Sequence, residues 1–297
     1  MPDSVPLIVY WLPLIGAMLF AGAAILTRKA ASFQLDIWLV CFVSNLVTAV
    51  AFQFLLLINH SFPSFELWWQ PALVSGLFVL GQVLTLNSLA KGDISISAPV
   101  LGLKVVFVPF LIRWLSGTSL PTMIWFACGL ATVGIALLNF SRGKSHSRRL
   151  FSLCTAGGGA AAYAMFDVCV QLRSPEWSQG AFLSTVFVGS TILSSSFLRA
   201  TPQRLQDIPA AAWPALLGSG ACFALQSLCI VCTIAFWGHA SIANVMYATR
   251  GLWSLLLVSL LGTRLGIREP GLTHDVFWIR FVGATILLVA IACLKFG

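Results

Sequence analysis

The chain has 297 residues, of which 59% are hydrophobic and only 9% charged, with a formal net charge of +8. A soluble domain carries roughly 25% charged residues on its surface, so this composition excludes a water-soluble globular protein. It predicts an all-α membrane protein whose apolar surface is covered by lipid.

Apolar stretches long enough to cross the bilayer recur along the whole chain, because about 20 residues suffice for a helix to span the hydrocarbon. Backbone polar groups cannot stay unpaired in lipid, so each stretch is expected to be helical. The ten expected transmembrane helices cover residues 7–27, 36–58, 70–90, 94–114, 121–140, 150–172, 179–198, 211–236, 240–262 and 274–296. The polar links between them are too short to form a soluble domain.

The two halves of the chain resemble each other. The segments "GDISISAPVLGLK" (92–104) and "GHASIANVMYATR" (238–250) both open with glycine, carry Ser-Ile at the fourth and fifth positions, and end in a cation. Gln82 and Gln226 likewise follow a proline by 11 and 12 residues. Because an odd number of helices inverts the second copy, we expect two inverted five-helix repeats, residues 1–145 and 146–297. Such repeats are typical of secondary transporters that bind ligand near the membrane midplane.

Four segments also resemble a known family. They are "LFAGAAILTRKA", "GDISISAPVLGLKVVFVPFL", "YAMFDVCVQL" and "NVMYATRGLWSLLL". Through them the chain resembles the EamA-type transporters of the drug/metabolite transporter superfamily. The resemblance implies a ten-helix carrier of small metabolites, often an exporter, in a plasma membrane such as the bacterial inner membrane. Many relatives carry a Gly-Glu pair after the fourth span, where this chain has "LSGTSLP", so the role of that glutamate is not carried over.

The basic residues bear on orientation, because Lys and Arg mark the cytoplasmic side. Apart from Lys104 and Arg250, 12 of them lie on one side of the ten-helix arrangement and only 3, Arg113, Arg173 and Lys295, on the other. This count places both termini outside the cytoplasm. The family resemblance implies cytoplasmic termini, so both orientations stay open.

Lys104 and Arg250 are the eleventh residues of their predicted spans and therefore start near the bilayer centre. Either cation would cost about 2.5–3.5 kcal/mol if it faced lipid there, so we expect both to face a protein interior or a watery cavity. One reading is that they bind a ligand. The other is that they form a structural ion pair or bind freed backbone carbonyls.

Tyr163, Asp167 and Gln171 are spaced i, i+4 and i+8, which predicts one polar stripe on the sixth span. Asp167 is the one acid deep in a predicted span. It is expected either to neutralise Lys104 or Arg250, or to carry a proton that couples transport. In both cases two cations and one acid leave one positive charge, which suits an anionic or zwitterionic ligand.

Further candidates for ligand contact lie in the ninth predicted span and at the glutamines that repeat between the two halves. Asn244, Tyr247 and Arg250 follow at three-residue spacing and share a helix face. Arginine offers a planar fork of donors that matches a carboxylate or phosphate. Gln82 and Gln226 are candidates because they repeat between the halves, although either is equally well explained as a bond between helices.

The sequence therefore predicts a secondary transporter, and most simply an exporter, that moves a small anionic or amphoteric metabolite by alternating access. The alternative is an exporter of neutral or aromatic amino acids or toxic organic compounds, with structural cations. Enzyme motifs are lacking, so no enzyme is expected. The eight cysteines lie in apolar runs and the histidines do not cluster, so no metal or other cofactor is expected. The expected partners are the substrate, the bilayer and a coupling proton; the basic link "SRGKSHSRR" is expected to contact anionic lipid rather than nucleic acid.

Overall fold

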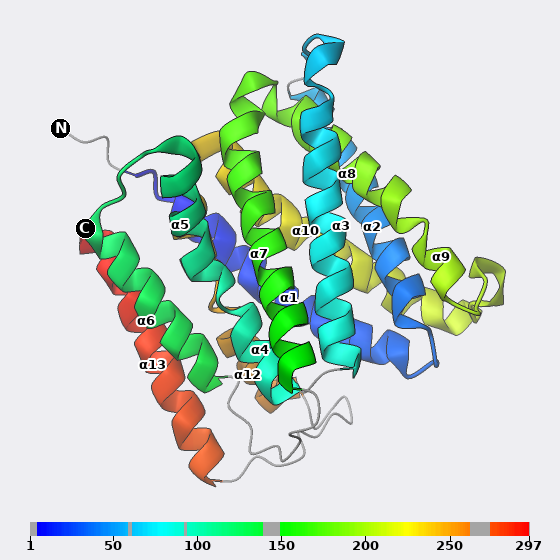
Figure 1. Ribbon diagram of the computed structural model, residues 1–297. Helices are drawn as coiled ribbons and strands as arrows, with labels where there is room; N and C mark the ends of the chain where they lie inside the picture. The colour runs from blue at the N-terminus through cyan, green and yellow to red at the C-terminus, as the bar shows by residue number, and fades with distance from the viewer. Residues whose placement is uncertain (1–4, 59–60, 92–93, 139–148, 262–273, 297) are drawn as a thin grey trace.

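A computed structural model describes residues 5–58, 61–91, 94–138, 149–261 and 274–296 (Figure 1). The regular structure in these ranges is helical, as the composition predicts. The α-helices are α1 (Ile8–Ala31), α2 (Ile37–Gln53), α3 (Trp69–Lys91), α4 (Ile94–Leu101), α5 (Lys104–Ser116), α6 (Thr122–Leu138), α7 (Arg149–Arg173), α8 (Gln179–Ser194), α9 (Phe197–Ala200), α10 (Trp213–Trp237), α11 (Ala240–Tyr247), α12 (Arg250–Leu261) and α13 (His274–Phe296). A helix or a pair of helices thus occupies each of the ten predicted ranges.

The helices have the length and surface of membrane-spanning segments. Seven helical stretches among the described residues are long and apolar enough to cross a membrane, and Thr122–Leu138 and Trp278–Leu294 form shorter apolar helices. Large apolar side chains such as those of Trp114 and Ile192 point outward, as contact with lipid requires. The prediction of an integral, multi-pass helical membrane protein is confirmed. The number of ten crossings and the inverted repeat stay predictions.

Two of the ten ranges contain a broken helix, and the breaks lie at matching places in the two halves. Between α4 and α5, the amides of Gly102 and Leu103 donate three residues back, to the carbonyls of Pro99 and Val100, both at 3.0 Å. Between α11 and α12, the amides of Ala248 and Thr249 also donate three residues back, at 3.2 and 3.3 Å, although the Ala248 amide shares its hydrogen with the Asn244 carbonyl four residues back at 3.0 Å. The first break is thus a single tight turn of 3₁₀ type, and the second a turn in which 3₁₀ and α-helical bonds overlap. The residue that starts the next helix is Lys104 in one half and Arg250 in the other.

The long helices pack mainly against helices of the other sequence half. α1 packs against α10, and α7 packs against α3. Two flanking pairs, α2 with α8 and α6 with α13, lie on opposite sides of the molecule (Figure 1). Under the predicted repeat, α1 corresponds to α7 and α10 to α3. The contact of α1 with α10 then corresponds to that of α7 with α3, and each flanking pair corresponds to itself.

Glycines set the closest of these contacts. Gly16 of α1 lies against Gln226 and Cys229 of α10, and Gly159 of α7 lies against Thr85 of α3. A β-carbon built on Gly16 would be 3.2 Å from the Gln226 carbonyl oxygen, and one on Gly159 would be 2.9 Å from Thr85 Oγ1. Small residues let helix backbones approach closely in this way within membranes.

We expect Gly283→Ala to destabilise the α6–α13 pair. A β-carbon at Gly283 would lie 2.8 Å from the Gly134 carbonyl oxygen and the Leu138 amide, which are backbone atoms that cannot step aside. Such overpacking costs about 1–3 kcal/mol, so thermal unfolding in detergent should begin at a lower temperature. Gly129→Ala, on the open face of α6 with nothing within 4 Å of the new methyl group, is the control and should leave stability unchanged or slightly raised. Equal unfolding temperatures for the two variants would contradict this account of the pair.

Candidate functional site

A buried ion pair forms the centre of the predicted polar stripe. Asp167 of α7 is 2% exposed, and its Oδ2 lies 2.7 Å from Lys104 Nζ at the start of α5. The same ammonium lies 5.8 Å from the centroid of the Tyr163 ring, one turn earlier on α7. Of the two cations that Asp167 was expected to neutralise, the structure pairs it with Lys104. Whether Asp167 also carries a proton stays a prediction.

The rest of the stripe binds α11. Asn244 Nδ2 donates to Asp167 Oδ2 at 2.6 Å and to the Ala240 carbonyl at 2.9 Å. One turn further along α7, Gln171 Oε1 accepts from the backbone amide of Ala240, the first residue of α11, at 2.9 Å. That amide has no partner within its own helix, so the glutamine satisfies it. Both amide hydrogens of Asn244 are used by these bonds, so this side chain joins α11 to α7; its contact with a ligand stays a prediction.

Arg250 has a different environment from Lys104. Its guanidinium carbon lies 4.9 Å from the centroid of the Tyr247 ring and 5.1 Å from that of Phe20 on α1. Among the described residues, no carboxylate pairs with it. The Tyr247 hydroxyl group also accepts a hydrogen bond from the guanidinium. Because a guanidinium has five N–H donors, these contacts leave donors for a further partner. Arg250 also starts α12, where the positive end of the helix dipole adds to its charge.

The remaining candidates separate into two groups. The hydroxyl group of Tyr247 donates to Gln226 Oε1 at 2.5 Å, so Gln226 belongs to the surroundings of Arg250. Gln82 instead makes a reciprocal amide pair with Asn45 of α2, with bonds of 2.8 and 2.9 Å. Because both polar ends of the Gln82 amide are used there, it fits the reading as a bond between helices. The structure therefore does not bring the two repeated glutamines into one site.

In the predicted alignment of the two halves, Lys104 and Arg250 occupy matching positions, and one acidic residue distinguishes their surroundings. Phe20 lies four residues after Gly16, and Tyr163 lies four after Gly159, so each cation lies over the equivalent ring of the helix beside it. Eight residues after these glycines stand Ala24 in α1 and Asp167 in α7. α1 therefore has no acid at the place where α7 carries Asp167, the acid that neutralises Lys104. Arg250 is therefore the cation whose charge no described carboxylate balances.

Phe20 is a residue of this cluster that the sequence analysis did not identify. Phe20 lies in an apolar run and nothing in its spacing distinguishes it from a lipid-facing side chain. Its ring makes edge contacts with Phe223 at 6.0 Å and Tyr247 at 6.1 Å, so three aromatic rings from α1, α10 and α11 gather beside Arg250. The alignment of Gly16 with Gly159 is the signal that could have identified it.

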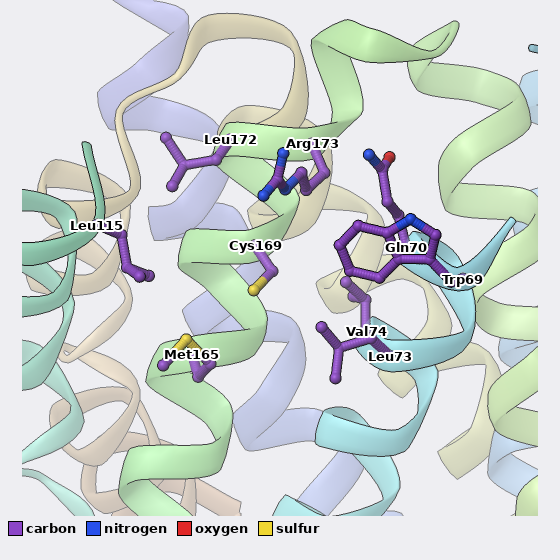
Figure 2. A pocket seen from close by; sticks show the side chains of 9 residues that line it. All are labelled: Trp69, Gln70, Leu73, Val74, Leu115, Met165, Cys169, Leu172 and Arg173. Carbon is purple, nitrogen blue, oxygen red and sulfur yellow. The ribbon is translucent and has the colours of Figure 1, made fainter. Parts of the chain in front are cut away.

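A pocket of about 240 Å³ between α3, α5 and α7 is separate from this cluster (Figure 2). Met165, Cys169 and Leu172 line it from α7, on the face opposite Tyr163 and Asp167. At one end lies Arg173, which is 5.7 Å from the Trp69 ring and is paired with Glu176 at 2.7 Å. The charge of Arg173 is thus already balanced by Glu176, and the walls of the pocket are mainly apolar.

The link before α11 contributes little charge at neutral pH, because burial lowers the pKa of His239. The electrostatics of the cluster are therefore set by Lys104, Asp167 and Arg250, whose formal charges sum to one positive charge.

Comparison with known proteins shows the fold and leaves the activity open. No family model matches the chain, and no curated protein is similar to it. Among the solved structures, 28 chains are similar. One of them, described as "Crystal structure of protein", superposes with a TM-score of 0.72 at 12% identity and covers 96% of each chain. At this identity the likeness shows a shared fold over nearly the whole chain.

Proposed function

We propose that this protein is a secondary active transporter that moves a small anionic or amphoteric organic metabolite across the membrane by alternating access. The observation that carries the proposal is Arg250, a cation at the start of α12 that lies over two aromatic rings and pairs with no described carboxylate. A lone positive charge inside a membrane protein is costly and marks a functional site by default. A ligand carboxylate or phosphate would supply the missing counter-charge to its fork of donors.

The arrangement of the helices supports the same proposal. Broken helices whose new starts point at a ligand, at matching places in two halves, are a recurring feature of transporters with inverted repeats. Here the breaks precede Lys104 and Arg250, and the contacts of α1 with α10 and of α7 with α3 are equivalent. We extend the proposal to ten crossings, to repeats at 1–145 and 146–297, and to membership of the EamA-type transporters, most simply as an exporter.

A second candidate function has one observation in its favour. Lys104 is neutralised by Asp167 at 2.7 Å, so at least one of the two cations is part of a structural pair. With Phe20, Phe223 and Tyr247 gathered beside Arg250, export of neutral or aromatic amino acids or of toxic organic compounds is the alternative. There the rings would recognise the ligand, and Arg250 would be held by them.

Pairs of acids and their amides distinguish the two candidates. Thermal unfolding of the purified protein would be measured with lactate and lactamide, glutamate and glutamine, and benzoate and benzamide. A ligand that binds the folded state raises the unfolding temperature by mass action. We expect an acid to stabilise the protein and its amide not to, and the stabilising acid to be taken up by proteoliposomes and not by empty liposomes. Equal stabilisation by benzoate and benzamide would favour the second candidate.

A further inference from the structure

The first helix of each sequence half is bound to helices of the other half. α1 packs against α10, α11 and α12. The hydroxyl oxygens of Thr27 on α1 and Ser219 on α10 are 2.6 Å apart, and the rings of Phe20 and Phe223 lie in edge contact at 6.0 Å. These three helices, together with α1, form one bundle, called bundle I below.

The equivalent contacts form a second bundle. α7 packs against α3, α4 and α5. A β-carbon on Gly81 of α3 would lie 2.9 Å from the Tyr163 ring, and the Lys104–Asp167 ion pair joins α5 to α7. These four helices are called bundle II. Each bundle takes one helix range from one sequence half and two ranges from the other.

We infer that the moving units of this protein are bundles I and II rather than its two sequence halves. The inference rests on the proposed function, since it states which parts separate during alternating access. Within a bundle the helices are joined by an ion pair, by hydrogen bonds and by glycine contacts at van der Waals distance, which do not slide without loss of packing. A rearrangement is therefore expected between the bundles, where the contacts are fewer.

Three hydrogen bonds between described residues join the bundles on the side where α7 ends, and together they are called the clasp. Asn244 donates to Asp167 at 2.6 Å, the Ala240 amide to Gln171 at 2.9 Å, and Ser174 Oγ to the Ala235 carbonyl at 3.2 Å. Asp167 and Gln171 lie on successive turns near the end of α7, and Ser174 follows directly after that helix. Asp167 takes part in contacts within and between the bundles. It pairs with Lys104 inside bundle II and accepts a hydrogen bond from Asn244 of bundle I.

The two flanking helix pairs, α2 with α8 and α6 with α13, are expected to stay packed while the bundles move. α2 and α8 meet through stacked rings of Phe52 and Phe187, 3.9 Å between centroids, and through a 2.7 Å bond from Ser184 Oγ to the Phe52 carbonyl. α6 and α13 touch through the backbones of Gly134 and Gly283. These pairs lie at opposite flanks of the molecule (Figure 1), so the two bundles can tilt between them while the flanks stay packed.

Spin-label distances test the inference without any ligand or transport assay. In a cysteine-free background in lipid nanodiscs, Leu7→Cys at the start of α1 is paired with Phe236→Cys near the end of α10, or with Thr118→Cys just after α5. The three positions are exposed and lie on the side of the clasp. The first pair is within bundle I but between sequence halves. The second is within one sequence half but between bundle I and the end of bundle II.

Two variants then weaken the clasp independently: Asn244→Ala removes the bond to Asp167, and Gln171→Ala removes the bond to the Ala240 amide. We expect both to add a longer-distance population, by at least about one helical turn of ~5 Å, to the Leu7–Thr118 pair while the Leu7–Phe236 distance stays fixed. A change in the Leu7–Phe236 pair would show that α1 does not move with α10. No change in either pair for both variants would overturn the clasp. Because no ligand is used, these outcomes are independent of whether the proposed substrate is right.

Discussion

Asp167→Asn is expected to lower the apparent free energy of unfolding by about 3–5 kcal/mol, the typical cost of removing one partner from a buried ion pair. Lys104, 18% exposed, would keep its charge with no acid beside it. The asparagine oxygen could still accept from Asn244, so the variant isolates the effect of charge from that of the hydrogen bond. Thermal or denaturant unfolding in detergent measures the change.

Removing both charges is the matched control. Lys104→Met combined with Asp167→Leu leaves no uncompensated charge, and such replacements of buried pairs by apolar residues are often neutral or stabilising. We therefore expect the double variant to recover most of the stability that Asp167→Asn loses. If Asp167→Asn keeps wild-type stability while the double variant loses it, the carboxylate acts mainly through Asn244 and not through Lys104.

Asp167→Asn also tests the proton reading. A coupling acid that is replaced by asparagine would leave substrate exchange intact while abolishing accumulation driven by a pH gradient. If the variant loses stability but exchange and pH-driven accumulation do not change differently, Asp167 serves the ion pair alone. Normal stability together with normal pH-driven accumulation would contradict both roles.

The helical ranges were predictable because hydrocarbon imposes a simple requirement. A helix must present about 20 apolar residues to the bilayer, and the sequence shows this directly. The polar stripe of α7 was predictable for a related reason: Tyr163, Asp167 and Gln171 stand out in an apolar span and share a helix face at four-residue spacing. That Asp167 contacts Lys104, and not Arg250, required the packing of α5 against α7.

Of the two helix breaks, only the one before Lys104 could be predicted from local sequence. Pro99 and Gly102 interrupt the pattern before Lys104, because proline lacks an amide donor and glycine weakens a helix. The matching segment "NVMYATR" contains neither, so no proline or glycine accounts for its break at Ala248 and Thr249. Internal symmetry, not local propensity, was the signal that could have indicated it.

The pairing of helices across the halves could not be predicted, because apolar faces carry little information about their partners. Phe20 is one apolar residue among many in α1, and only the contact of Gly16 with α10 brings its ring to Arg250. Likewise, a polar partner is expected for Asn45 and for Gln82, because both lie in apolar spans, but nothing in the sequence indicates that they bind each other. Helices in lipid associate by close packing and by scattered hydrogen bonds, whose partners depend on the whole arrangement.

Arg250→Gln is expected to weaken the binding of an acidic ligand by about 1.5–3 kcal/mol, the value of a charge-assisted hydrogen bond. That corresponds to a roughly ten- to hundredfold loss of affinity. The variant should still fold, because Arg250 has no described acid to leave unpaired and its charge is costly to insert. Here the two cations should differ: Lys104→Gln is expected to reduce stability, since Asp167 would be left buried alone.

The measurement is the concentration of acid that half-saturates the rise in unfolding temperature, compared for wild type, Arg250→Gln, Arg250→Lys and Arg113→Gln. Arg113 is an exposed cation in the last turn of α5, so its replacement changes the net charge equally without touching the cluster. Arg250→Lys keeps the charge but loses the planar fork and should fall between wild type and Arg250→Gln. The amide of the same acid should be affected little by any of them, because it carries no charge for Arg250 to meet. An acid that binds Arg250→Gln as tightly as wild type would make Arg250 a structural cation, held by Phe20 and Tyr247, and recognition by the aromatic rings would then explain the site.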